Sequence, residues 1–253
     1  MFRILVADKL GPAGLRRLEE ESDVTVDVKT GLSKTELCSL ISAYDALLVR
    51  SSTQVDADLL SVAEKLRVIG RAGMGVDNID VAAATARGVL VMNTPGVNSI
   101  ATAEHTILLM LAAARHTAEA HQSVHQGEWR RSDFTGVQLY RKVLGLIGFG
   151  RIARHVAKRA RTFDMEIIAF DPYVSEEVGQ EMGITLVDLE ELLAQADVIS
   201  LHASLSAETL HILNTDTLAK TKDGVIIINP SRGKLVDEPA LAEALTSGKV
   251  RPA

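Results

Sequence analysis

A glycine-rich turn lies near the middle of this chain, between an apolar segment and a helical one. Gly148 and Gly150 follow the apolar residues 143–147, and Ala153 stands where the dinucleotide-binding fingerprint has its third small residue. The first glycine permits a tight turn, the second lets a pyrophosphate approach the backbone, and the third small residue lets helix and sheet pack closely. The amide groups that begin the following helix favour an anionic ligand. The spacing therefore predicts a dinucleotide-phosphate site.

An acidic residue completes this pattern. Asp171 directly follows a second apolar run, residues 167–170, about 20 residues after the glycines. A carboxylate there can accept hydrogen bonds from both ribose hydroxyls, and it would repel a 2′-phosphate, so we expect NAD rather than NADP. A purely structural glycine turn is the competing interpretation, but it requires neither the flanking strand and helix nor the acid.

A second candidate site is an arginine after a strand. The segment Asn229-Pro230-Ser231-Arg232-Gly233 leaves an apolar run and precedes a helix start at residues 236–238. An arginine at the carboxyl end of a strand can grip a carboxylate and polarise a neighbouring carbonyl. A surface salt bridge is the alternative for Arg232 taken alone.

The elements that position these residues alternate along the chain. Short apolar runs and helical periods follow one another throughout, which predicts βα units and parallel sheets. We expect α/β architecture with two doubly wound parallel-sheet domains, residues 1–95 and 96–253, separated by the Asn93-Thr94-Pro95-Gly96 break. Ligands of such sheets bind at the carboxyl ends of the strands, so we expect a cleft between the two domains.

A long amphipathic stretch opens the second domain. Residues 99–126 are longer than a compact crossover needs, and Ile107, Leu108, Leu111, Ala114 and Ala118 are expected on one side. One interpretation is a helix that covers the sheet. We favour the other, an arm shared with a second subunit, and hence a homo-oligomer.

Composition restricts the other partners. A net charge of −6 argues against nucleic acid or an anionic membrane. The longest strongly apolar run, residues 107–114, is too short to span a bilayer. The single cysteine, Cys38, suits a reducing compartment, and a strand begins at once with no room for a signal peptide, so we expect a cytoplasmic protein. No histidine lies in a metal-ligand pattern, and we expect no metal.

The segment Asn229–Leu241 resembles the signature of the D-isomer-specific 2-hydroxyacid dehydrogenases. The resemblance implies a flavodoxin-like substrate domain and a Rossmann NAD-binding domain that is incomplete at its C-terminus. It makes Arg232 the catalytic, substrate-orienting arginine and His202 a wall of the cofactor site rather than an acid–base group. The cofactor-binding residues that it implies are Met74, Gly148, Gly150, Arg151, Ile152, Asp171, His202, Ala203, Pro230, Ser231 and Arg232.

The first half resembles the branch of this family that oxidises D-3-phosphoglycerate to 3-phosphohydroxypyruvate, the first committed step of L-serine biosynthesis. The resembling segments are residues 49–53, 63–66, 70–78, 93–95 and 98–99. Arg50 and Arg71 each follow a strand, and a phosphate plus a carboxylate calls for more than one guanidinium, although domain-closing salt bridges are an alternative. The implied ligands of a phosphorylated 2-hydroxy acid are Arg50, Ser51, Arg71, Gly73, Met74, Gly75 and Asn98.

The proton donor that this chemistry needs is not among these residues. The resemblance implies a histidine supported by a glutamate, both at positions beyond Ala253, so we expect a C-terminally truncated chain that is inactive alone. Two other functions stay open. One is a different 2-hydroxyacid dehydrogenase, acting on glyoxylate or hydroxypyruvate, and the other is a non-catalytic, dimeric NAD-binding protein.

Overall fold

The structure, a computed structural model, describes residues 1–251, which form two compact units that divide between Asn98 and Ser99. Each unit is built on a five-stranded sheet whose strand pairs are all parallel. The predicted fold class, two doubly wound parallel-sheet α/β units, is confirmed. The residues before Ser99 are called the first unit below, and those from Ser99 onward the second unit.

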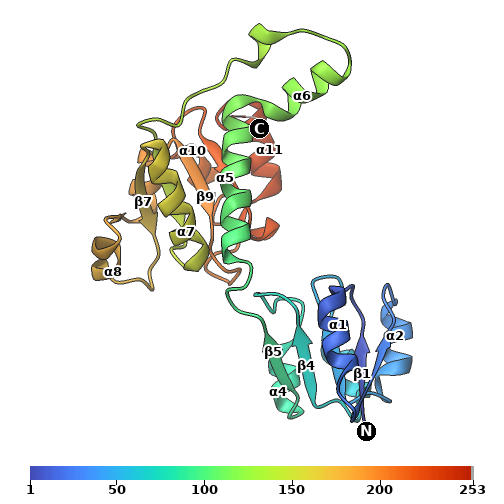
Figure 1. The fold of residues 1–253 in the computed structure, drawn as a ribbon. Coiled ribbons are helices and arrows are strands. Elements are labelled where there is room, and N and C mark those ends of the chain that lie inside the picture. The colour runs from blue at the N-terminus through green and yellow to red at the C-terminus, as the bar shows by residue number, and fades with distance from the viewer. Residues whose placement is uncertain (252–253) are drawn as a thin grey trace. The chain divides into compact units, whose positions relative to one another are not determined.

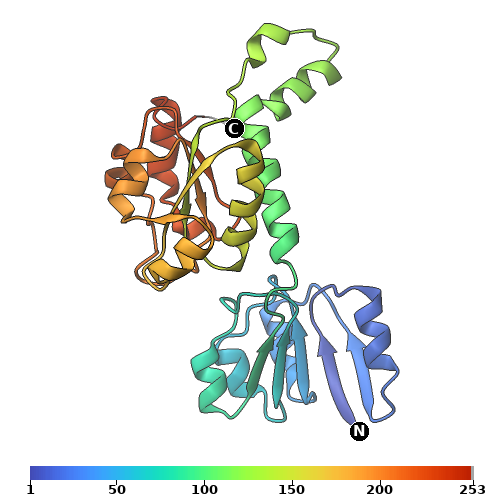
Figure 2. The same cartoon turned by 60° about the vertical axis from the view of Figure 1, so that its left-hand side comes forward.

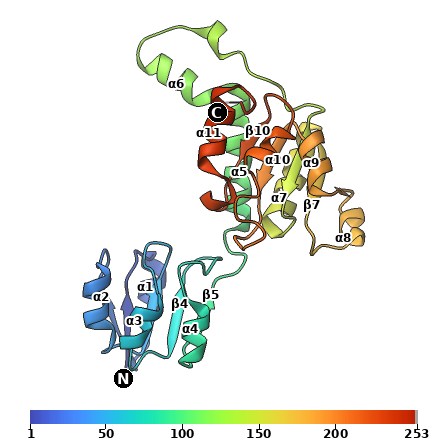
Figure 3. The same cartoon turned by 180° about the vertical axis from the view of Figure 1, so that it is seen from behind.

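The sheet of the first unit has the strand order β2-β1-β3-β4-β5, which is the flavodoxin-like order (Figures 1 and 2). Its strands are β1 (Phe2–Val6), β2 (Val24–Val28), β3 (Ala46–Val49), β4 (Val68–Arg71) and β5 (Leu90–Asn93). Its helices are α1 (Pro12–Glu19), α2 (Lys34–Ile41), α3 (Ala57–Val62) and α4 (Val81–Ala86). Contacts of α3 with both α2 and α4 place these three helices on one face of the sheet (Figure 3).

Side-chain caps begin three of these helices. Ser33 and Glu36 form a reciprocal capping box at α2, while Asp56 and Asp80 accept backbone N–H groups at the starts of α3 and α4. Such caps satisfy donors that the first helical turn leaves without partners. The core lies between these helices and the sheet and includes the fully buried Ile41, Leu47, Leu60 and Ile69. The caps and this core hold the strand ends that carry the candidate substrate residues.

The sheet of the second unit has the order β10-β9-β6-β7-β8, which matches five strands of the Rossmann order. Its strands are β6 (Val143–Ile147), β7 (Glu166–Phe170), β8 (Thr185–Leu186), β9 (Val198–Leu201) and β10 (Ile226–Ile228). Its helices are α5 (Ser99–Arg115), α6 (Thr117–His125), α7 (Arg151–Ala160), α8 (Glu176–Glu181), α9 (Leu189–Gln195), α10 (Thr215–Ala219) and α11 (Glu238–Thr246).

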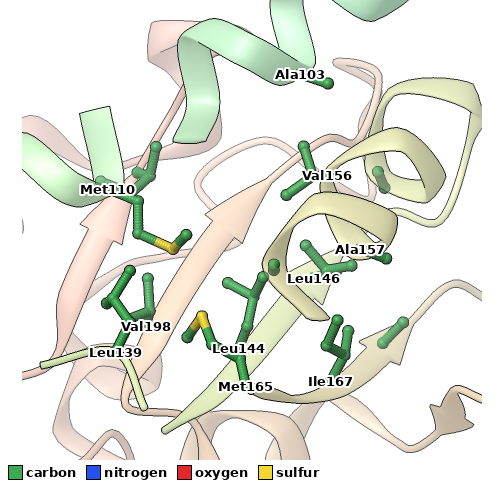
Figure 4. Packing of buried hydrophobic residues seen from close by; sticks show 14 of the residues in the cluster. Ala103, Met110, Leu139, Leu144, Leu146, Val156, Ala157, Met165, Ile167 and Val198 are labelled. Carbon is green, nitrogen blue, oxygen red and sulfur yellow. The ribbon is translucent and has the colours of Figure 1, made fainter. Parts of the chain in front are cut away.

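Helices cover both faces of this second sheet. On one face α5 packs against α7, and Met110 and Val156 meet Leu144 and Leu146 of β6 in a wholly apolar cluster (Figure 4). On the other face α9, α10 and α11 enclose a second cluster around Ile199 and other buried aliphatic residues. Burial on both faces explains why these strands are continuous apolar runs rather than alternating ones.

The long stretch 99–126 differs from the prediction. It is not one helix, because His116 has a left-handed backbone (φ 52°) that ends α5 and starts α6 in a new direction. Of the residues expected on one apolar side, Ala114 is fully buried and Ile107 and Leu111 pack against the same core as Met110, whereas Leu108 is 60% exposed. Helix α6 and the short turn Arg131–Phe134 extend away from the sheet of the second unit (Figure 1).

Among residues 1–251, no helix combines the length and the apolar character needed to cross a membrane.

Candidate functional site

The second unit gathers its candidate residues at one edge of the sheet. After β6 the chain proceeds outward to β7 and β8, and then returns to build β9 and β10 on the other side of β6. This reversal creates a topological switch point between β6 and β9, where open α/β sheets bind their ligands. Gly148 follows β6, Asp171 follows β7, His202 follows β9 and Asn229 follows β10.

Gly148 is required by both its conformation and its surroundings. Its φ of +87° lies in the left-handed region, and a Cβ there would come within 2.7 Å of the Ala203 backbone nitrogen. The turn therefore brings the end of β6 directly against the chain that leaves β9. A side chain at this position would push those two segments apart.

Gly150 differs from Gly148 because it leaves open space. It is the N-cap residue of α7, has an ordinary φ of −77°, and a Cβ there would meet nothing within 4 Å. No side chain caps this helix, so its first amide groups face outward from the turn. Ala153, in the first turn of α7, is completely buried in the cluster against β6. An uncapped helix start beside an open glycine can accept a phosphate, and Arg151 and Ile152 are its first residues.

The Asp171 carboxylate is fixed against the glycine turn. Its Oδ2 accepts the backbone N–H of Phe149 at 2.7 Å, and its Oδ1 accepts that of Tyr173 at 2.9 Å. The Phe149 side chain is fully buried, and Arg154 donates its Nε–H to the Phe149 carbonyl. The sequence pattern did not identify Phe149 or Arg154, because a backbone amide leaves no trace in residue type.

His202 is a neutral group at the end of β9. Burial lowers the pKa of His202 to about 4, so the imidazole carries no charge near neutral pH. Its Nε2 lies 2.9 Å from the Ser200 hydroxyl, while its buried Nδ1 has no hydrogen-bond partner within residues 1–251. A ring in this state is a poor proton donor at pH 7, and its Nδ1 is a polar atom that a bound molecule can satisfy.

The arginine segment after β10 is held by its own side chains. Asn229 donates its amide to the Arg232 carbonyl at 2.8 Å and accepts the Ser231 N–H at 3.1 Å. The Ser231 hydroxyl donates to the carbonyl of Leu201, the last residue of β9, at 2.8 Å. These bonds tie the segment to the strand end that carries His202 and Ala203. They explain the asparagine and the serine that precede Arg232 in the signature segment.

These features fit a dinucleotide. Open space at Gly150, an uncapped helix start, a fixed carboxylate at the next strand and the buried His202 Nδ1 all lie at the switch-point edge. The predicted cofactor residues of the second unit are brought together there: Gly148, Gly150, Arg151, Ile152, Asp171, His202, Ala203, Pro230, Ser231 and Arg232. Met74, the remaining one, belongs to the first unit.

In the first unit the two candidate arginines have different environments. Arg50 is exposed directly after β3, whereas Arg71 is the last residue of β4 and only 9% exposed. The Arg71 Nε–H donates to the Asn78 Oδ1 at 2.8 Å. Since β3 and β4 are parallel neighbours, the two arginines leave the sheet at the same edge.

Two buried polar residues that the sequence did not single out organise this edge. Asp8, after β1, accepts the backbone N–H groups of Arg50 and Thr53 and the Thr53 hydroxyl. Asn78 donates its amide to the carbonyls of Arg50 and Thr53. An Asn or Asp in a loop has many ordinary roles, so residue type alone did not distinguish these two.

The glycine-rich loop after β4 is held mainly by backbone bonds. Gly73 donates its N–H to the Arg71 carbonyl at 2.9 Å and accepts the Thr94 N–H at 3.0 Å. The side chain of Asn93 donates to the Met74 carbonyl at 2.6 Å. Three other predicted substrate residues follow strands of this sheet in the chain. Ser51 after β3 and Asn98 after β5 are exposed, and Gly75 after β4 is half-buried.

Comparison with known proteins identifies the family of this chain. The family described as D-isomer specific 2-hydroxyacid dehydrogenase, NAD binding domain, matches residues 107–253. The chain therefore belongs to the D-isomer-specific 2-hydroxyacid dehydrogenases and carries their NAD-binding domain.

Two curated relatives are each named D-3-phosphoglycerate dehydrogenase. The one from Methanocaldococcus jannaschii is 50% identical over 254 residues, and the one from Archaeoglobus fulgidus is 46% identical over 252 residues. Each alignment covers 100% of this chain but 48% of the relative, so the chain spans about half the length of these curated relatives.

Solved structures give the same fold. A protein of Thermus thermophilus is 38% identical, with a TM-score of 0.89 over 96% of this chain and 78% of that one. A glyoxylate reductase from Paecilomyes thermophila is 35% identical, with a TM-score of 0.88 over 98% of this chain and 79% of that one.

Proposed function

We propose that this chain supplies the substrate and NAD sites of an enzyme that oxidises D-3-phosphoglycerate to 3-phosphohydroxypyruvate, the first committed step of L-serine biosynthesis. The names of its curated relatives support this substrate. The observation that carries the proposal is the pair Arg50 and Arg71, which leave adjacent strands at one edge of the first sheet. A phosphorylated carboxylate is a trianion near neutral pH, and guanidinium groups are its most suitable ligands.

In the proposed reaction the substrate C2–H bond and its hydroxyl O–H bond break as the C2 carbonyl forms. NAD, when bound, supplies the hydride acceptor. Arg232 would hold the substrate carboxylate and polarise the C2 oxygen, because a guanidinium offers paired donors to a planar oxyanion. The buried, neutral His202 would line the nicotinamide side without donating a proton.

The hydroxyl proton needs a separate base. Family resemblance assigns it to a histidine–glutamate pair at positions beyond residue 253.

The test is the binding of ligands to the 253-residue chain by calorimetry in the presence of NADH. We expect 3-phosphoglycerate to bind at least about tenfold more tightly than D-glycerate, because the phosphate adds charge-assisted hydrogen bonds. Arg50→Ala should remove this preference. Arg16→Ala removes the same charge from an exposed position on α1 of the first unit and should keep it.

Two outcomes would favour other functions. Equal binding of D-glycerate and 3-phosphoglycerate, together with binding of glyoxylate, would favour a dehydrogenase for unphosphorylated 2-hydroxy acids. Tight NADH binding without affinity for any 2-hydroxy or 2-oxo acid would favour a non-catalytic NAD-binding protein.

We also propose that the protein is a homo-oligomer whose subunits meet through α5 and α6. Three large apolar residues support this surface, since Leu108, Val124 and Trp129 are 60%, 58% and 84% exposed. Helix α6 packs mainly on α5 and on the turn that follows it, so most of its surface is left uncovered by the rest of residues 1–251. Val124 and Trp129 belong to the projecting segment, and large apolar side chains exposed on such a segment are typical of a subunit interface.

A further inference from the structure

Asn78 uses both ends of its side-chain amide inside the first unit. Its Oδ1 accepts the Arg71 Nε–H at 2.8 Å, and its Nδ2 donates to the carbonyls of Arg50 and Thr53 at 2.8 and 2.6 Å. The residue is 6% exposed, so water does not compete strongly for these bonds. One buried amide thus connects β4 to the loop that follows β3.

The bond from Asn78 constrains the orientation of Arg71. The Arg71 side chain is buried and passes over Gly73, where any Cβ would collide with Arg71 Nη1. A guanidinium is planar, so a fixed Nε–H direction also limits the directions of its Nη1 and Nη2 donors. Gly73 provides the space that this orientation needs.

The loop that bears Arg50 is clamped from two sides. Asp8 Oδ2 accepts the backbone N–H groups of Arg50 and Thr53, at 2.6 and 3.2 Å, while Asn78 donates to the carbonyls of the same two residues. Donors and acceptors of this short loop are therefore both satisfied by buried side chains. The exposed Arg50 side chain extends from a backbone that has little freedom to move.

We propose that Asn78 is a positioning residue that couples Arg50 and Arg71 into one anion-binding unit, with Asp8 as the second anchor of the Arg50 loop. The inference rests on the proposed function only in assigning 3-phosphoglycerate to the two arginines. The coupling itself follows from the three bonds of the Asn78 amide. Because the Arg71 guanidinium is already oriented and the backbone that bears Arg50 is already held, less of the site has to be ordered when the anion binds, and this raises affinity.

The first measurement needs no ligand. NMR of the Arg71 Nε–H group, assigned by its loss in Arg71→Lys, reports whether the bond to Asn78 persists. In Asn78→Ala we expect this proton to exchange with solvent at least about tenfold faster. In Asn78→Asp the acceptor for Arg71 is kept and the donors to the loop are lost, so the Nε–H should stay protected while the Arg50 and Thr53 amides exchange faster.

The second measurement is calorimetry with 3-phosphoglycerate and D-glycerate in the presence of NADH. We expect Asn78→Ala and Asn78→Asp to weaken 3-phosphoglycerate binding about tenfold or more, and to weaken D-glycerate binding less. Ser33→Ala is the matched control, because it removes the capping box of α2 and lowers stability without touching the arginines. It should leave both affinities and the Arg71 signal unchanged.

The outcomes separate this inference from the proposed function. Wild-type affinity and wild-type Arg71 protection in Asn78→Ala would overturn the positioning role. Failure of the unchanged chain to bind 3-phosphoglycerate would overturn the proposed substrate, while the exchange measurement would still decide the coupling. Should Asn78→Ala not fold, Asn78→Asp and Asp8→Asn carry the same test, with Asp8→Asn expected to loosen the Arg50 loop and leave the Arg71 Nε–H protected.

Discussion

The Asp171 carboxylate accepts the backbone N–H of Phe149 at 2.7 Å, so the acid that ends β7 is bonded to the middle of the turn that ends β6. Its second oxygen accepts the Tyr173 N–H. A carboxylate has about four acceptor positions, and two bonds to the backbone leave capacity for a pair of ribose hydroxyls. The turn proposed to bind the pyrophosphate and the acid proposed to bind the ribose are therefore held together by a direct hydrogen bond.

Replacing Asp171 by alanine should weaken NADH binding about 10- to 100-fold, because hydrogen bonds to a charged acceptor are lost together with the bond that holds the turn. The preference for NADH over NADPH should also shrink, since no carboxylate remains to repel the 2′-phosphate. Fluorescence titration of both nucleotides measures the two effects. Asp223→Asn is the control, because Asp223 is an exposed acid of the same unit. Unchanged NADH affinity in Asp171→Ala would contradict the assignment.

Replacement by alanine should chiefly lower the stability of the fold at Gly148 and chiefly lower the affinity for NADH at Gly150. Gly148→Ala forces a left-handed φ and a Cβ 2.7 Å from a backbone nitrogen, so it should lower the free energy of unfolding by at least about 2 kcal/mol. Gly150→Ala meets open space at an ordinary φ and should cost roughly 0.5 kcal/mol. Its NADH affinity should nevertheless fall about tenfold or more, since the new methyl group occupies space needed by the pyrophosphate.

Chemical denaturation and NADH titration of both variants separate structure from binding. Gly224→Ala is the reference for a left-handed φ without a clash, because Gly224 has a φ of +72° and no neighbour within 4 Å of its would-be Cβ. It should lose about 1 kcal/mol of stability. If Gly150→Ala binds NADH as tightly as the unchanged chain, the pyrophosphate does not approach at Gly150.

How far the sequence could predict this molecule depends on the kind of interaction. Parallel strands buried on both faces are continuous apolar runs, so the strand Val143–Ile147 was predicted with its observed bounds. The break at His116 was not predicted, because a left-handed residue other than glycine leaves no signal in the composition. Leu108 is exposed because α5 packs its other side against α7 and the sheet, and periodicity alone does not determine which side of a helix packs inward.

The candidate sites show the same division. Gly148, Asp171 and Arg232 belong to compact sequence patterns, and each pattern has a mechanical reason that can be stated without a structure. Asp8 and Asn78 both form hydrogen bonds with the backbone of Arg50, which lies 42 positions from Asp8 and 28 positions from Asn78 in the chain. Only the folded chain brings such residues together, so their roles could not be predicted from spacing.

The state of His202 makes the stability of the second unit depend on pH. Burial lowers its pKa from 6.5 to about 4, so the unfolded chain binds a proton more readily than the folded one. The free energy of unfolding therefore has its full value, as far as His202 is concerned, above about pH 6.5. It falls progressively as the pH falls toward 4, by about 3 kcal/mol in total. Denaturation at several pH values should show this loss, and NMR titration should place the His202 pKa well below the ordinary value.

His202→Gln removes the titrating group and should flatten the pH dependence of the free energy of unfolding between pH 6.5 and about 4. His105→Gln is the matched control, since His105 is exposed on α5 and should leave the profile unchanged. An ordinary pKa for His202, or the same profile in the glutamine variant, would show that the imidazole is not held neutral by burial and that its role in the cofactor site needs revision.

The proposed subunit interface can be tested with a single charge. Val124 on α6 is 58% exposed, so Val124→Glu should cost little in the folding of one chain. At an apolar subunit interface the same carboxylate would be buried without a partner, and this should weaken association at least about 100-fold. Sedimentation velocity over a range of protein concentrations measures the shift toward monomer. Val62→Glu on α3, at an apolar position that is 40% exposed in the first unit, is the control and should sediment like the unchanged chain. An unchanged oligomer in Val124→Glu, or a monomer for the unchanged chain, would remove α6 as the surface through which subunits meet.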